Sequence, residues 1–87
     1  MMIFRLQTPA QLADHLRSFR KARGLTQADL GKLSGVNQAR IAKIERDPTR
    51  MSVGQLLQLL AALRVRVLLE VDADEADAKA RNRASDW

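Results

Sequence analysis

The chain has 87 residues, 46% of them hydrophobic and 29% charged, and its formal net charge is +5. This length fits one small domain, which cannot bury most of its own surface and is therefore expected to gain from dimerisation. The absence of cysteine excludes disulfides and thiol nucleophiles, and no apolar run has the length of a membrane span or signal peptide, so we expect a soluble cytoplasmic protein with no membrane partner.

The charge is distributed unevenly along the chain. Residues 1–71 carry 12 Lys and Arg against 5 Asp and Glu, a formal charge of +7, whereas residues 72–87 carry 3 against 5, a charge of −2. A basic body favours a polyanion partner, because each phosphate that it neutralises releases counterions; a merely solubilising surface is the alternative. We therefore expect a folded body over residues 1–71 and a flexible acidic tail over residues 72–87.

The first elements are a short extended segment and a helix. In residues 2–6 we expect Ile3, and either Met1 or Phe4, to seal an edge of the core. A capping box, Thr8 to Gln11, then opens a helix that continues to Gly24 with its apolar positions at helical spacing. Its far face carries cations for which phosphate contact and plain solvation are equally good explanations: Arg17, Arg20, Lys21 and Arg23. The single histidine, His15, has no second ligand nearby, which indicates a surface or half-buried structural histidine and no metal site.

Residues 26–45 read as two short helices joined by a tight turn. Thr26 and Asp29 form a second capping box, and Leu30 and Leu33 are expected to face inward. Gly35 occupies a position that requires positive φ, and Asn37 is a good N-cap for the second helix. That helix places Ile41 and Ile44 on the core and ends at Asp47-Pro48.

The outer face of this second helix is suited to a DNA groove. With the two isoleucines inward, the solvent side carries Gln38, Ala39, Ala42, Lys43 and Arg46. Small residues let a helix approach bases closely, glutamine can pair bidentately with adenine, alanine methyls can touch a thymine methyl, and the cations suit phosphate. The pattern predicts a DNA-reading helix; an ordinary helical hairpin is the alternative.

These residues resemble the helix-turn-helix of the Cro and cI repressor family over about two thirds of the chain. The resemblance is carried by Gln27, Leu30, Gly31, Gly35, Val36, Ile41, Ile44 and Glu45. It implies that Gln27 and Ala28 contact DNA from the first helix, and that the recognition helix reads bases with Asn37, Gln38, Ala39 and Arg40. Gly31 replaces the usual alanine, which suits a close helix crossing but weakens the helix by roughly 1 kcal/mol.

A leucine-rich helix and a strand follow. After Arg50, a further candidate for phosphate contact, Ser52 and Gln55 form a third capping box. The leucine arc of this helix is wider than one small core requires, so we expect Leu57 and Leu60 to meet a second subunit, unless the other helices cover the whole arc. Residues 65–71 alternate as a strand, which is expected to pair with its copy across a two-fold axis through Val65, Val67, Leu69 and Val71.

The sequence therefore predicts an all-α, four- to five-helix, lambda-repressor-like domain with a short C-terminal strand in an intermolecular sheet. This order of elements, with the tail ending in Asp86 and Trp87, resembles the HipB antitoxins of HipA/HipB toxin–antitoxin modules. The resemblance implies a homodimeric repressor that binds a palindromic operator and neutralises a HipA-like serine/threonine kinase toxin, with Asp86 and Trp87 as toxin contacts.

Two other functions are compatible with the same residues: a stand-alone Cro-like or cI-like regulator without a toxin, and a protein-interaction module without a specific DNA site. No pattern of residues indicates catalysis, a cofactor, a metal or a small-molecule substrate.

Overall fold

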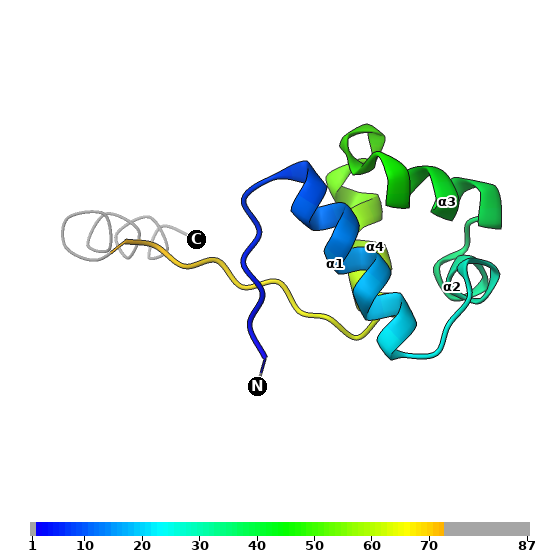
Figure 1. Cartoon of the computed structure of the whole chain (residues 1–87), viewed down its shortest axis with the longest axis horizontal. Coiled ribbons are helices and arrows are strands. Elements are labelled where there is room, and N and C mark those ends of the chain that lie inside the picture. The colour runs from blue at the N-terminus through cyan, green and yellow to red at the C-terminus, as the bar shows by residue number, and fades with distance from the viewer. Residues whose placement is uncertain (1, 73–87) are drawn as a thin grey trace.

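The structure is a computed structural model, and it describes residues 2–72. This part of the chain folds into four α-helices and one short 3-10 helix, η1 (Figure 1). Their bounds are α1 (Pro9–Ala22), α2 (Gln27–Ser34), α3 (Gln38–Arg46), η1 (Pro48–Arg50) and α4 (Val53–Ala62). The expected all-α class is confirmed, and within residues 2–72 no helix has the length and apolarity that crossing a membrane requires.

Each α-helix is preceded by an N-cap residue whose side chain accepts a hydrogen bond from a backbone N–H of the first turn. Thr8 and Thr26 form the complete capping boxes expected from the sequence, with Gln11 and Asp29 accepting the return hydrogen bonds. The third expected box is only half present: the Ser52 hydroxyl accepts from Gln55 N at 3.0 Å, but the Gln55 side chain bonds elsewhere.

The core is built from aliphatic side chains of all four α-helices. Six are 1–2% exposed: Leu16, Leu30, Ile41, Ile44, Leu59 and Leu63. The inward positions of Leu30 and the two isoleucines are confirmed, but that of Leu33 is wrong, because its side chain is 61% exposed. The buried stripe of α2 is Leu30, Gly31 and Ser34, and Leu33 lies well to one side of it on the helix.

A charged pair is buried beside this core. Arg20 is 9% exposed, and its Nε and Nη2 donate to the two Glu45 carboxylate oxygens at 2.7 and 3.1 Å. Its Nη1 also donates to the Leu25 carbonyl at 2.9 Å. Both solvation and phosphate contact are therefore wrong for Arg20. It lies four residues after Leu16 and shares the inward stripe of α1.

The segment before α1 lies against that helix through aromatic contacts and hydrogen bonds, one of which runs from Gln7 N to Gln11 Oε1 at 2.6 Å. The Phe4 ring meets the rings of Phe19 and His15 edge-on, at centroid distances of 5.0 and 5.4 Å. His15 Nε2 lies 2.7 Å from the Arg5 carbonyl oxygen, which confirms a half-buried structural histidine. The expectation for Ile3 is wrong, since it is 81% exposed.

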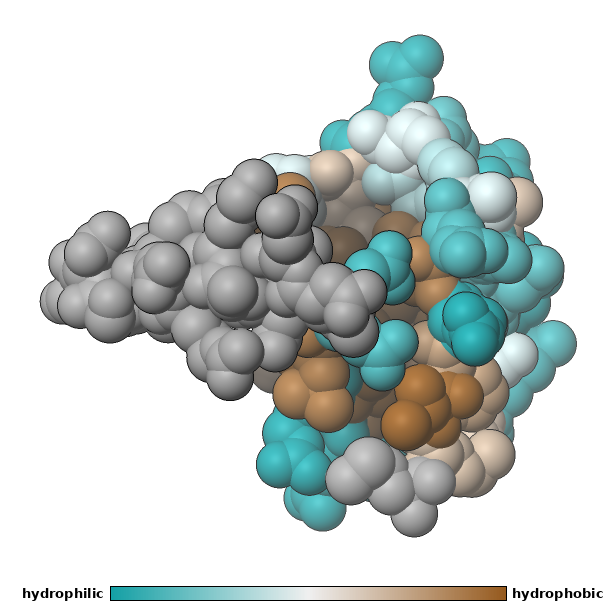
Figure 2. Space-filling view, turned by 90° about the vertical axis from the view of Figure 1, so that its left-hand side faces the viewer, coloured by the Kyte–Doolittle hydropathy of each residue, from teal (hydrophilic) through white to brown (hydrophobic). Residues whose placement is uncertain are grey.

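The chain after α4 leaves the domain as an exposed segment. Residues 2–72 of the single chain contain no strand, so the sheet expected from residues 65–71 is not formed within one protomer. This segment and residues 2–7 both lie on the side of the domain opposite α2 (Figure 1). The face that carries them shows apolar side chains among polar ones (Figure 2). On these two segments, the large hydrophobic side chains that are at least 46% exposed are Met2, Ile3, Phe4, Leu6, Val67, Leu68, Leu69 and Val71.

The expected dimer contacts of α4 divide into two cases. Leu57 is 50% exposed, as expected, whereas Leu60 is 6% exposed and belongs to the protomer core. Leu60 therefore has little surface to offer a second subunit, because it packs against other helices of its own chain. Both line a groove of about 460 Å³ that is continued by Val65 and Val67. The tail, with Asp86 and Trp87, lies outside the described residues.

Candidate DNA-binding surface

The turn between α2 and α3 depends on two glycines. Gly35 ends α2 with φ of +77°, the left-handed conformation expected from the sequence. Val36 N then donates to the Gly31 carbonyl at 2.9 Å. A Cβ on Gly31 would overlap the Val36 carbonyl oxygen and lie 3.4 Å from the Asn37 carbonyl carbon. This close approach therefore requires glycine at position 31 in place of the usual alanine. Gly31 lowers the intrinsic stability of the helix, but it also allows α2 to approach the turn closely.

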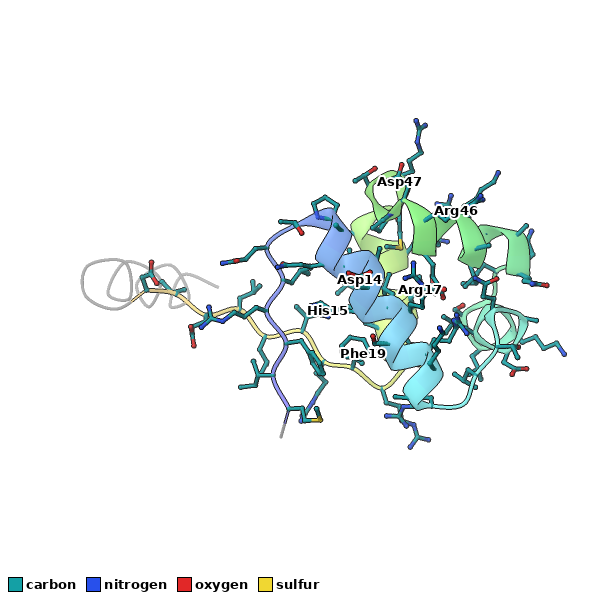
Figure 3. All side chains as sticks on the ribbon, in the orientation of Figure 1. Asp14, His15, Arg17, Phe19, Arg46 and Asp47 are labelled. Carbon is teal, nitrogen blue, oxygen red and sulfur yellow. The ribbon has the colours of Figure 1, made fainter. Side chains whose placement is uncertain are left out.

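The recognition helix α3 presents the outer face expected from its sequence. Gln38, Ala39, Lys43 and Arg46 are exposed, and Ala42 is half-buried. The Arg46 side chain projects away from the domain (Figure 3). Asn37 caps the helix, with its Oδ1 accepting from Arg40 N at 2.8 Å. The side of α3 that carries small and cationic side chains is thus accessible to a DNA groove, while Ile41 and Ile44 pack the opposite side of the helix into the core.

Arg40 is placed differently from the other side chains expected to read bases. It is half-buried, and its Nη2 donates to Gln55 Oε1 on α4 at 2.9 Å. On the helical wheel of α3 it lies at the edge between the core side and the outer face. It therefore belongs to the flank of the surface that adjoins the N-terminus of α4.

The contribution of α2 is organised by Glu45. Gln27 and Ala28 are half-buried at the first turn of α2. Gln27 Nε2 donates at 3.3 Å to Oε1 of Glu45, the carboxylate that also binds Arg20. Arg17 Nη2 donates to the Glu45 carbonyl at 3.1 Å, from a position on α1 (Figure 3). One buried carboxylate therefore connects α1, the start of α2 and the end of α3.

The sequence contained a signal for this cluster that its interpretation missed. Arg20 is four residues after Leu16, and Glu45 is four residues after Ile41, so both lie on inward stripes. A cation and an anion on facing inward stripes indicate a buried ion pair. The part of the chain that the structure describes has no cluster of acidic or histidine side chains that could hold a metal.

Beyond α3, the surface continues to Arg50, whose side chain is 84% exposed. Its Nε lies 3.7 Å from Asp47 Oδ2, an exposed ion pair that contributes little to stability. The Thr49 hydroxyl and backbone N–H donate to the Asp47 carboxylate and hold its pKa below the ordinary value. Arg50 is therefore available to phosphate, with one carboxylate beside it.

Two helices joined through a left-handed glycine, with the second helix exposed along a polar and cationic side, define a helix-turn-helix domain. Comparison with known proteins agrees, since the helix-turn-helix family model matches residues 16–68. The chain is 33% identical over 81 residues to Antitoxin HipB of Escherichia coli O6:H1 (strain CFT073), covering 92% of this chain and 85% of that protein. It is 29% identical over 89 residues to Antitoxin HipB of Escherichia coli (strain K12), covering both chains completely.

Solved structures show the same relationship. A HipB-O1-O2 complex superposes with a TM-score of 0.72 at 28% identity, covering 78% of this chain and 99% of that one. A HipA-HipB-O2-O3 complex superposes with a TM-score of 0.73 at 28% identity, covering 83% of this chain and 100% of that one. The chain belongs to the helix-turn-helix family and, within it, to the HipB antitoxins.

Proposed function

We propose that this chain is the antitoxin of a HipA/HipB-type toxin–antitoxin module: it represses its own operon by binding operator DNA and it neutralises a HipA-like serine/threonine kinase. The observation that carries the proposal is likeness to HipB over 92% of the chain, combined with an exposed recognition face on α3. Relatives solved as a HipB-O1-O2 complex and a HipA-HipB-O2-O3 complex support both partners.

In this function α3 enters the major groove. Gln38 and Ala39 read base edges near its N-terminus, together with Asn37 and Arg40, while Lys43, Arg46 and Arg50 grip phosphate. Gln27 and Ala28 contact DNA from the first turn of α2. The chemistry is recognition, so the proposal assigns the chain no catalytic step, cofactor or small-molecule substrate, and operator binding places its action in the cytoplasm.

The working unit is a homodimer. The exposed side chains of residues 65–71, with Leu57 beside them, form an apolar surface that one protomer leaves uncovered. Pairing of these segments across a two-fold axis would satisfy their backbone groups and cover that surface. The operator is then an inverted repeat with half-sites one helical turn, roughly 34 Å, or a multiple of it apart.

Two substitutions on α3 test the DNA assignment, because they separate base reading from phosphate contact. Gln38→Ala should relax sequence preference and cost roughly 1 to 3 kcal/mol at one base step. Arg46→Ala should weaken binding to all duplexes about equally and reduce the salt slope by about one. Fluorescence anisotropy with operator and scrambled duplexes measures both, and unchanged discrimination in Gln38→Ala would contradict the recognition-helix assignment.

A second toxin contact, beside one made by the main body, is assigned to the end of the acidic tail (residues 72–87), with Trp87 as an apolar anchor and Asp86 as its charged neighbour. Deleting residues 84–87 should weaken binding to the HipA-like kinase and leave operator binding nearly intact, because acidic residues are repelled by phosphate. Calorimetric titration of full-length and truncated chains into the kinase measures the difference. Equal affinities would remove the tail from the toxin interface.

A further inference from the structure

The Gln55 side chain departs from the local pattern around it. In the two complete capping boxes, the third helical residue accepts from the N-cap backbone: Gln11 from Thr8 N at 3.2 Å, and Asp29 from Thr26 N at 3.0 Å. At the start of α4 the same spacing is present, yet Gln55 Oε1 accepts from Arg40 Nη2 at 2.9 Å. Gln55 thus accepts from a residue fifteen positions away and not from the backbone N–H of its own N-cap, so its side chain makes a tertiary contact.

This contact restricts a long and flexible side chain at the edge of the recognition helix. A free arginine side chain loses rotamer entropy when a ligand immobilises it. The hydrogen bond to Gln55 uses one of five guanidinium N–H donors, so the same group can still donate to a base or a phosphate. Gln55 therefore reduces the entropy that Arg40 would lose on binding, while most of the guanidinium N–H donors stay available to DNA.

The chemistry of the tether distinguishes Arg40 from the buried arginine of the core. Arg20 is held by the Glu45 carboxylate, which neutralises its charge, and it is 9% exposed. Arg40 is held by a neutral amide and is only half-buried. A carboxylate would bind about twice as strongly but would cancel the positive charge that attracts DNA. The amide keeps that charge while it orients the group.

We propose that Gln55 is a positioning residue for operator recognition. It holds Arg40 in the orientation that reads the operator, so part of the sequence preference is set from α4, outside the two helices α2 and α3 that meet the DNA. The inference rests on the proposed DNA-binding function and adds a specificity determinant to it. The Arg40–Gln55 pair acts as one unit, in which Arg40 contacts DNA and Gln55 acts only through Arg40.

The test uses the full chain and a duplex that the wild type selects from a randomised library, with a scrambled duplex as reference. The readout is the ratio of the two affinities at one salt concentration, with the melting temperature measured in parallel. Arg40→Ala and Gln55→Ala should each lower this ratio, by about tenfold for the loss of one oriented arginine contact. Gln58→Ala is the matched control, since Gln58 is an exposed glutamine of the same helix, and should leave the ratio unchanged.

Two further variants separate positioning from a structural role. Arg40→Ala combined with Gln55→Ala should lower the ratio no further than Arg40→Ala alone, because Gln55 has no effect without its partner. Gln55→Glu keeps the acceptor but adds negative charge, so affinity should fall for both duplexes while their ratio is retained.

A Gln55→Ala ratio equal to that of the wild type would overturn the inference, as would additive losses in the double variant. A fall in melting temperature with equal weakening on both duplexes would make the bond structural. These results are distinct from failure of the proposed function, in which the wild type itself would select no sequence.

Discussion

Comparing Gly31→Ala with Gly54→Ala tests how closely α2 approaches the turn that precedes α3. Both glycines are helical, and alanine is intrinsically better in a helix by up to about 1 kcal/mol. At Gly54 the new Cβ would contact only Ser52 Oγ, at 3.9 Å. At Gly31 it would overlap the backbone carbonyl oxygen of Val36, which cannot move without shifting the turn. The two variants should therefore change stability in opposite directions.

The magnitudes follow from these surroundings. Gly54→Ala should stabilise by about 0.4 to 1 kcal/mol, because the unfolded chain loses freedom and the folded chain has room. Gly31→Ala has the same gain, but overpacking costs about 1 to 3 kcal/mol and strain on the bond from Val36 N to Gly31 O puts about 1 kcal/mol more at risk. We expect a net loss of about 1 to 3 kcal/mol, where each kcal/mol corresponds to roughly 4 to 8 °C in a domain of this size.

Thermal unfolding at one fixed protein concentration is the appropriate assay, because dimerisation would make the melting temperature depend on concentration. The melting temperature should rise for Gly54→Ala and fall for Gly31→Ala. Equal increases in both variants would refute the reasoning, since they would mean that the space beside Gly31 accepts a methyl group and that α2 does not pack so closely on the turn.

Three other outcomes are expected. Leu69→Asp and Val67→Asp should split the dimer and abolish tight operator binding, because a charge would enter the apolar dimer interface. The control is Leu33→Asp, at a position of α2 that is 61% exposed. A wild type that sediments as a monomer at micromolar concentration would contradict the dimer. Arg20→Met should lower the free energy of unfolding by about 3 to 5 kcal/mol, because it leaves the Glu45 carboxylate buried without its partner. The double variant Arg20→Met with Glu45→Leu should recover most of that loss, as measured by denaturant unfolding. A double variant that loses more stability than the two single variants added together would argue against a paired role. The Thr26 backbone N–H donates to the Asp29 carboxylate and lowers its pKa. Asp29 therefore stabilises the fold above about pH 4 and loses this contribution as the pH falls through its lowered pKa. The stability gap between wild type and Asp29→Asn should narrow as the pH falls, and a gap that does not change with pH would rule this out.

Local rules in the sequence were sufficient for most of the fold. Thr8, Thr26 and Asn37 cap helices because each side chain satisfies a backbone donor only three residues away. Gly35 ends α2 because left-handed φ is inexpensive for glycine alone. Ile41 and Ile44 follow from helical periodicity. Each of these inferences needs only a short stretch of chain, which is why the structure confirms them.

The remaining features depend on partners far along the chain. Long cations on a helix are usually solvated, so the sequence around Arg20 predicts an exposed side chain, and only the position of Glu45 on α3 explains its burial. Spacing alone assigns Gln55 to its own helix end, and only the approach of α3 explains its bond to Arg40. The exposure of Leu33 and the burial of Leu60 differ from the prediction because the inward direction of a short helix is set by the helices that pack on it.

The hydrogen bond between His15 and the Arg5 carbonyl constrains the tautomer of the imidazole ring. A carbonyl oxygen can only accept, so Nε2 must carry the proton at this 2.7 Å contact, and in the neutral ring Nδ1 is the unprotonated nitrogen. The imidazole thus joins the chain before α1 to that helix in two ways, because Nε2 donates to the Arg5 carbonyl while the ring packs with the rings of Phe4 and Phe19.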